Sequence, residues 1–373
     1  MNKLISFLVI KKYELKLKLP RRVWSVLYKV SMKKFIDQKV YGERRKLRKD
    51  TEVVFYIIRR RPPGAGLFSN VFHVIQGIIN ARNIVIDVNK KGEEHQKEIR
   101  DKKLENKVGG GDIVPIVDFQ NYYMSQLHLK GEFPLNTNSW EIYFEQLSTF
   151  SLDNVYKDYS YILCDAKFKN SESFLLKKAP LWVYDDEKLF EVSQIINNYI
   201  RPSRKLEELI NSWKNLIDWN PYTTLAVGVR GGNYEKYQYS GHAKQVTFDQ
   251  IVPEIELFIE KYPVSMIYLQ THSYNNYERL QKRFGKIIQK PLSMESYSDI
   301  SQFLSLSPKD APKHWDRVPE LTFKNNSRYM VDIYLMAEAR YLIAPLSNGV
   351  AFAFAKNVRN LIDYKIMDLG VYG

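Results

Sequence analysis

The chain alternates between short apolar runs and segments whose apolar residues recur at helical spacing. The apolar runs are rich in β-branched and aromatic residues and predict strands. These strands are expected over residues 52–58, 84–88, 112–119, 159–164, 180–184, 223–229, 264–270, 340–344 and 360–364. Helices are expected up to about residue 79 and over residues 138–146, 188–218 with a break at Arg201-Pro202, 248–261, 274–284, 332–339 and 350–357. Strands that alternate with helices indicate an α/β protein with parallel sheets.

The length of the chain suits two domains of ordinary size. A protein of 373 residues exceeds what one hydrophobic core usually supports. The polar turn Trp219-Asn220-Pro221 closes a helical stretch and marks the expected boundary. We expect a basic arm over residues 1–50, an α/β domain over 51–218 and a second α/β domain over 219–373. Each would be Rossmann-like, and the ligand would lie in a cleft between them.

Positive charge is concentrated at the amino terminus. The formal net charge is +14, and residues 1–61 hold 19 Lys and Arg against 5 Asp and Glu, so the remainder is neutral. Apolar residues recur at roughly helical spacing between Val23 and Phe35 among lysines and arginines. This pattern is typical of a helix lying on an anionic membrane surface, and also of an amphipathic helix packed on the protein's own body. No specific nucleic-acid partner is expected, because no recognisable nucleic-acid module is present.

Composition narrows the class of protein further. Hydrophobic residues at 45% and aromatic residues at 14% exclude a disordered chain. The apolar run at residues 4–10 is far shorter than the ~20 residues that cross a bilayer. The single cysteine, Cys164, cannot form an internal disulfide, which favours a reducing compartment. The expected location is the cytoplasm, peripheral to a membrane if the basic arm binds lipid.

A predicted strand that stops at an arginine is the clearest candidate for chemistry. The sequence Leu225-Ala226-Val227-Gly228-Val229 is followed by Arg230-Gly231-Gly232. An arginine at the carboxyl end of a parallel strand, beside backbone without side chains, is well placed to clamp a phosphate with its planar fork of donors. The plainer interpretation is an ordinary Gly-Gly turn after a strand.

Two more glycine-containing loops open predicted helices. Ser347-Asn348-Gly349 follows the apolar strand at residues 340–344 and begins the next helix. Near the amino terminus, Gly64, Gly66 and Asn70 lie in a loop before another apolar helix.

Together these segments resemble the fucosyltransferase superfamily that includes the nodulation and core alpha-1,6, the alpha-1,2 and the protein O-fucosyltransferases. The resemblance covers roughly residues 52–90 and 220–365. Its central motif is His-x-Arg-Arg-x-Asp, or His-Val-Arg-Arg-Gly-Asp-Tyr in the alpha-1,2 branch. This chain has Gly228-Val229-Arg230-Gly231-Gly232-Asn233-Tyr234 in its place, which keeps the first arginine, a glycine and the tyrosine. The histidine, the second arginine and the aspartate are replaced.

The resemblance implies a GT-B-like fold and transfer of a sugar, fucose from GDP-fucose, to a glycan acceptor. Arg230 would be the catalytic cation. The implied donor-binding residues are Arg230, Gly231, Asn233, Tyr234, Thr271, His272, Ser273, Asp332, Ser347, Asn348 and Gly349. The implied acceptor-side or interdomain residues are Gly64, Gly66, Asn70, Glu235 and His242. Thr271, His272 and Ser273 stand where one branch carries the acidic residues that read guanine, so the donor base is the least certain part of this expectation.

The sequence predicts a mechanism without metal or other cofactor. No Asp-x-Asp motif is present, and the six histidines show no metal-ligand spacing. Basic side chains and helix amino termini would then stabilise the departing diphosphate. Glu235 and His242 are the candidates for the general base.

Three other functions stay open at this point. A glycine-rich turn at Gly64 and Gly66, followed by Asp87, is close to the nicotinamide dinucleotide motif, but Ser69 replaces its third glycine. A nucleic-acid-binding protein is suggested by the basic arm. A glycan-binding relative without catalysis is suggested by the missing motif residues.

Overall fold

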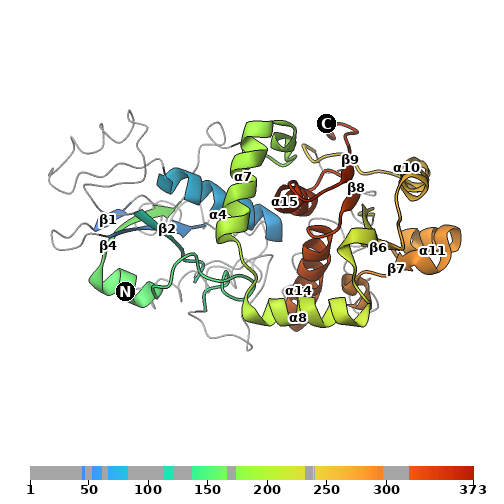
Figure 1. The fold of residues 1–373 in the computed structure, drawn as a ribbon. Coiled ribbons are helices and arrows are strands. Elements are labelled where there is room, and N and C mark those ends of the chain that lie inside the picture. The colour runs from blue at the N-terminus through green and yellow to red at the C-terminus, as the bar shows by residue number, and fades with distance from the viewer. Residues whose placement is uncertain are drawn as a thin grey trace, which may run out of the picture. The chain divides into compact units, whose positions relative to one another are not determined.

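The computed structural model describes residues 44–46, 53–60, 66–82, 113–120, 137–165, 174–231, 238, 240–296 and 319–373. These residues divide into two compact units (Figure 1). The second unit contains the described residues from 174 onward and also residues 66–69. The first unit contains the other described residues, all of which come before residue 166.

The first unit contains a four-stranded sheet in the order β1-β4-β2-β3. Its strands are β1 (Arg44–Lys46), β2 (Val54–Arg59), β3 (Ile113–Val117) and β4 (Ser160–Asp165). The central strand β2 pairs in parallel with both β3 and β4, whereas β1 pairs antiparallel with β4. Because β1 joins the sheet, the expected basic arm over residues 1–50 ends before Arg44.

Helices cover both faces of this sheet. Alternate β2 side chains, Phe55 and Ile57, share a buried cluster with α6 (Leu152–Asp158). On the other face, α4 (Leu67–Arg82) approaches Ile58 so closely that a Cβ at Gly77 would lie 2.7 Å from the Ile58 side chain. The period of two along the strand therefore decides which helix each side chain meets.

The second unit contains a five-stranded, fully parallel sheet in the order β7-β6-β5-β8-β9. Its strands are β5 (Thr224–Gly228), β6 (Met266–Gln270), β7 (Ile288–Gln289), β8 (Tyr341–Pro345) and β9 (Asp363–Met367). Every residue of β5 and β8 is buried, because helices cover both faces of the sheet.

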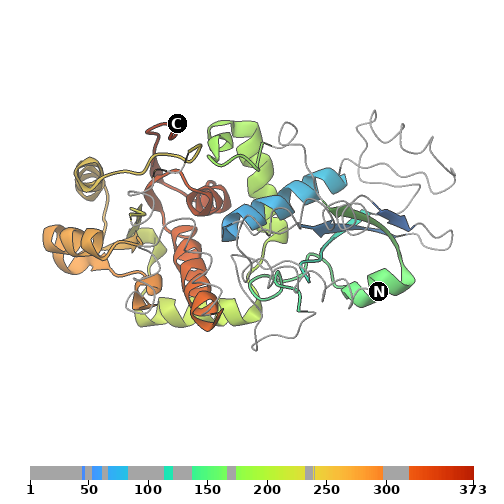
Figure 2. The ribbon, with the colours of Figure 1, turned by 180° about the vertical axis from the view of Figure 1, so that it is seen from behind.

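The helices of the second unit form two layers and an outer pair. One layer is α10 (Phe248–Lys261) and α11 (Tyr274–Phe284), and the other is α14 (Pro319–Met336) and α15 (Asn348–Asn357), on the opposite side of the sheet (Figures 1 and 2). Residues of α10 and α11 share a core cluster with Leu225 and Val227 of β5. The outer pair, α7 (Asp186–Tyr199) and α8 (Arg204–Leu216), packs on α15 and α14 respectively. Short 3-10 turns are η3 (Leu181–Tyr184), η4 (Pro221–Thr223), η5 (Gly285–Ile287) and η6 (Leu292–Ser296).

The expected α/β class and the parallel sheets are confirmed, and the expected domain boundary differs. The sequence places the boundary after residue 218, but α7 and α8 belong to the second unit. The physical reason is their packing on α15 and α14. A helical stretch followed by a polar turn looks like a linker in sequence, whereas tertiary contacts decide the grouping.

Two local predictions are wrong. The expected strand over residues 180–184 is the 3-10 turn η3, which leads into α7 through the cap Asp185. The expected helix over residues 138–146 is a series of turns. Its apparent capping residue, Asn138, instead bonds the end of β3: its Oδ1 accepts from Phe119 N at 3.0 Å and its Nδ2 donates to Val117 O at 2.7 Å. Trp140, Tyr143 and Phe144 of this segment are buried in the core.

Several expectations fall outside the described residues. They are the basic arm up to residue 43 with its membrane role, and the strand at residues 84–88 with Asp87. Within the described part of the chain, no helix is long and apolar enough to cross a membrane.

Candidate functional site

The second sheet has a topological switch point at its centre. From β5 the chain builds β6 and β7 on one side and then β8 and β9 on the other. Open α/β sheets bind ligands beyond the carboxyl ends of the strands at the point where the strand order reverses. Here that point lies between β5 and β8. Arg230 follows β5, and the Ser347 loop follows β8, so two predicted loops flank it.

The segment after β6, Thr271-His272-Ser273, lies beside Arg230 because parallel pairing continues past the ends of β5 and β6. Val229 N donates to Gln270 O at 2.9 Å, and His272 N donates to Arg230 O at 2.8 Å. The backbones of Arg230 and His272 are thereby fixed next to each other.

A pocket opens at this edge of the sheet. All of its described lining residues belong to the second unit. They are Gly66, Leu67, Phe68, Ser69, Lys178, Arg230, His242, Ala243, Gln245, Tyr329, Leu346, Ser347, Asn348 and Gly349.

Two helix amino termini line the pocket. Ser347 caps α15, and its side chain accepts from Val350 N at 3.2 Å. The first turn of α4 is tied to the same place, because Asn348 Nδ2 donates to Ser69 Oγ at 2.8 Å. Free backbone N–H groups and the helix dipole make such termini favourable for anions.

Positive side chains add to this field. Arg230 and Lys178 both line the pocket, and no carboxylate is among its described lining residues. Two cations and two helix amino termini together make the pocket a site for an anion such as a phosphate or diphosphate.

The two histidines near Arg230 are neutral. Burial, Arg230 and Lys178 lower the pKa of His242, which lines the pocket. Burial and then Arg230 lower the pKa of His272 to about 3. The His272 ring lies against Tyr329, with ring centroids 5.5 Å apart. Neither imidazole contributes positive charge at neutral pH, and each can accept a proton or a hydrogen bond.

The segment that carries His242 is held by the carboxyl-terminal residues. Gly241 N donates to Tyr372 O at 2.8 Å, Tyr372 N to His242 O at 2.9 Å, and Lys244 N to Gly370 O at 2.9 Å. This short pairing fixes one wall of the pocket.

Close packing fixes the part of the lining that contains Gly349 and Tyr329. A Cβ at Gly349 would lie 2.4 Å from the Tyr329 hydroxyl and 3.0 Å from Ile333 Cδ1. Only glycine therefore lets α14 bring Tyr329 against the first turn of α15.

The structure brings six of the predicted site residues together and separates others. Arg230, His242, Ser347, Asn348, Gly349 and Gly66 line the pocket. Thr271 and Ser273 do not. Thr271 Oγ1 accepts from Ser273 N, and Ser273 caps α11 by accepting from Asn276 N at 3.2 Å. The predicted residues Asn233, Tyr234, Glu235 and Gly64 lie outside the described residues.

Asp332 was expected to bind the donor or orient Arg230, and it lies elsewhere. Its helix, α14, begins at Pro319, so Asp332 occupies the end of a long helix and not the start of a short one. The carboxylate is fully buried and accepts from Tyr268 Oη at 2.6 Å, Leu292 N at 2.8 Å and Ser293 N at 3.2 Å. It holds η6 against α14 and β6.

Burial makes Asp332 a pH-dependent element of stability. It raises the pKa of this carboxyl from 3.8 to about 6. The protonated form is favoured in the folded state, so the stabilisation is complete below pH 3.8 and is lost as the pH rises through 6. We expect the free energy of unfolding of the parent, relative to Asp332→Asn, to fall by about 2 kcal/mol between pH 4 and pH 7 in urea titrations.

Asp363 provides a control, because its contribution to stability should change with pH in the opposite direction. Its hydrogen bond from Tyr262 lowers its pKa, so its stabilisation is present above its unfolded pKa and lost in acid. The parent should therefore gain stability relative to Asp363→Asn as the pH rises. A difference between parent and Asp332→Asn that does not change with pH would contradict the assignment.

Sequence reasoning missed several pocket residues, chiefly Lys178, Gln245 and Tyr329. Lys178 stands far from Arg230 in the chain, and nothing in the neighbouring sequence distinguishes it from other surface lysines. Tyr329 had a usable signal: it lies four positions before Ile333, so extending the helical period backward from the predicted helix places it on the same face.

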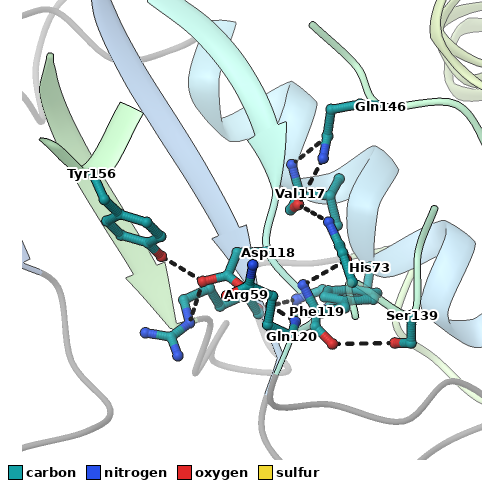
Figure 3. A network of polar contacts seen from close by, with 10 residues as sticks. Arg59, His73, Val117, Asp118, Phe119, Gln120, Ser139, Gln146 and Tyr156 are labelled. Atoms are coloured by element: carbon teal, nitrogen blue, oxygen red, sulfur yellow. Dashed lines mark hydrogen bonds and ion pairs between the residues drawn. The ribbon is translucent and has the colours of Figure 1, made fainter. Parts of the chain in front are cut away.

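A second polar network lies at the carboxyl edge of the first sheet (Figure 3). Asp118, after β3, pairs with Arg59 Nε at 3.4 Å and accepts from Tyr156 Oη and Gln120 N. His73 of α4 contacts Arg59 O through Nε2 at 2.8 Å. Each group in the network has its partner within the unit, so it fixes the strand ends.

Asn70, predicted on the acceptor side, belongs to this first unit. It is fully buried, and its Oδ1 accepts a hydrogen bond from Arg60. Its observed contact is structural.

In the described part of the chain, no group of three or more His, Cys, Asp and Glu side chains could hold a metal ion. Independence from metal stays a prediction.

Comparisons with known proteins give remote likenesses only. No protein-family model matches the chain, and no curated protein matches its sequence. Among solved structures, it is similar to the fucosyltransferase NodZ from Bradyrhizobium, with 14% identity, a TM-score of 0.36, and coverage of 80% of this chain and 91% of that one. It is also similar to NodZ alpha-1,6-fucosyltransferase soaked with GDP-fucose, with 15% identity, a TM-score of 0.40, and coverage of 86% and 96%. A third similar structure is a mutant of Arabidopsis thaliana FUT1 in complex with GDP, with 11% identity and a TM-score of 0.35. That comparison covers 94% of this chain and 77% of the other. Since these likenesses are remote, the proposals below rest on the residues of this chain.

Proposed function

We propose that this protein is a glycosyltransferase that moves a sugar from a nucleotide diphosphate donor to a glycan hydroxyl. The donor that we propose is GDP-fucose, following the resemblance of the segments around Arg230 and Ser347. No metal or other cofactor is part of the proposal.

One observation carries the proposal. Arg230 and the amino terminus of α15 meet in one pocket at the switch point of a parallel sheet. A dinucleotide or nucleotide diphosphate is the kind of ligand that such a place accommodates, and the positive field there favours the diphosphate.

In the proposed reaction, Arg230 acts on the leaving group. The bond between the sugar C1 and the diphosphate oxygen breaks, and negative charge grows on the diphosphate. The guanidinium of Arg230 and the N–H groups at the start of α15 stabilise this charge in the transition state. The acceptor oxygen forms the new bond to C1 and gives up its proton.

His242 is the proposed acceptor of that proton. It lines the pocket and is neutral, because burial and the nearby cations lower its pKa. Glu235, the other candidate, lies outside the described residues and stays a prediction.

Two unpartnered oxygens in the pocket suit a sugar. Gln245 Oε1 and Asn348 Oδ1 are buried, and neither has a hydrogen-bond partner among the described residues. Buried acceptors are nearly always satisfied, so a ligand that brings hydroxyl donors would complete them.

The test is release of GDP from GDP-fucose by the purified full chain. We expect slow release that EDTA does not change. Asn348→Ala should reduce the release, because it removes a buried acceptor and the tie to Ser69. Asn357→Ala, on the same helix but bonded to Ala339 O at 2.6 Å, serves as the structural control.

Two results would contradict the proposal. One is no release from GDP-fucose or any other nucleotide sugar under conditions in which the protein is folded. The other is oxidation of NADH, which would favour the oxidoreductase alternative.

A further inference from the structure

Lys178 is a cation of the pocket that the motif around Arg230 does not include. It stands in the segment before η3, and it lines the pocket together with Arg230. The resembling motif has a second arginine directly after the first, and this chain has Gly231 at that position. The pocket therefore takes its second positive side chain from a distant part of the sequence.

The ammonium of Lys178 is held in place by two contacts. Its Nζ donates to Ser240 O at 2.7 Å. Its stem lies over Gly241, whose φ is +74°, and a Cβ there would be 3.2 Å from Lys178 Cδ. A larger residue at Gly241 would push the stem aside, so the left-handed glycine makes room for the lysine.

This arrangement leaves the charge available to a ligand. A lysine ammonium has three N–H donors, and one of them is used by Ser240 O. Within the described residues no carboxylate pairs with Lys178. Lys178 lines the pocket with Arg230 and His242, and burial, then Arg230 and Lys178, lower the pKa of His242.

We infer that Lys178 is the second cation that contacts the diphosphate, acting with Arg230. The inference rests on the proposed function. The planar fork of Arg230 would bind two oxygens, and the ammonium of Lys178 would bind as a point charge.

The experiment measures binding of inorganic pyrophosphate and GDP to the full chain by calorimetry. Lys178→Met removes the charge and keeps a long unbranched stem over Gly241. We expect both dissociation constants to rise about tenfold, the usual effect of losing one charge-assisted hydrogen bond. Lys178→Arg should keep most of the affinity. Lys177→Met, which changes the adjacent exposed lysine outside the pocket, should bind like the parent.

The controls separate failure of this inference from failure of the proposed function. If the parent binds and Lys178→Met binds as tightly as Lys177→Met, the role of Lys178 is overturned and the proposed function stands. If the parent binds neither probe, both are overturned. The inference is supported if Lys178→Met binds pyrophosphate more weakly than the parent, Lys177→Met does not, and the unfolding midpoint of Lys178→Met equals that of the parent.

Discussion

Replacing Arg230 with lysine is expected to lower turnover about a hundredfold while changing donor affinity much less. Lysine keeps the positive charge but loses the planar pair of donors that matches two oxygens of the leaving diphosphate. The lost interaction is strongest in the transition state, so kcat should fall more than KM rises. Arg230→Ala should be more severe, by about a further tenfold or more, because the charge is lost as well.

Arg279→Lys is the matched control. Arg279 lies on α11 with its guanidinium 3.8 Å from the centre of the Phe248 ring, and it is not among the pocket residues. The same substitution there should leave rates near those of the parent. Transfer by Arg230→Ala within about threefold of the parent would mean that Arg230 is an ordinary arginine after a strand, since one transition-state donor is worth about a hundredfold or more.

Gly231→Ala is expected to destabilise the protein by about 3 kcal/mol, which is the second large effect. Gly231 has a φ of +62°, a conformation that costs any other residue. A methyl group there would also lie 2.5 Å from Ser273 Cβ and 3.0 Å from Asn276 Nδ2. The backbone must shift, and Arg230 shifts with it, so activity should fall along with the midpoint of urea unfolding.

Gly370→Ala separates the cost of the positive φ from the cost of the contact with Ser273 and Asn276. Gly370 has a φ of +76° but nothing within 4 Å of its Cβ position. Gly370→Ala should therefore lose only the stability that the positive φ costs an alanine, about 1 kcal/mol. Equal losses of stability in the two variants would indicate that the contact with Ser273 has no effect.

The fold of the second unit could be predicted because its central strands, β5 and β8, are buried on both faces. β5 and β8 appear in the sequence as largely apolar runs, and the first polar residue comes two positions after each strand, at Arg230 and at Ser347. Arg230 and Ser347 could be placed at one edge of the sheet, because the carboxyl ends of parallel strands lie on the same side. The periodicity of α10 and α11 was equally clear.

The remainder depends on contacts between distant residues. The aromatic segment at residues 138–146 has the local pattern of a capped helix, but its cap, Asn138, is taken by the end of β3. Asp332 looked like a helix start because nothing local shows that α14 begins at Pro319. Lys178 enters the pocket through Ser240 and Gly241, a contact that no spacing in the sequence indicates.

The central claim is that the diphosphate binds at the carboxyl edge of the second sheet, and hydrogen exchange with and without GDP tests it most directly. We predict protection of backbone amides after β5 at residues 229–231, at the start of α15 and in the segment from Gly241 to Gln245. The amides of the first unit's network around Asp118 should exchange as in the free protein. Protection confined to α4 from Asn70 onward, with none beyond residue 222, would contradict the claim.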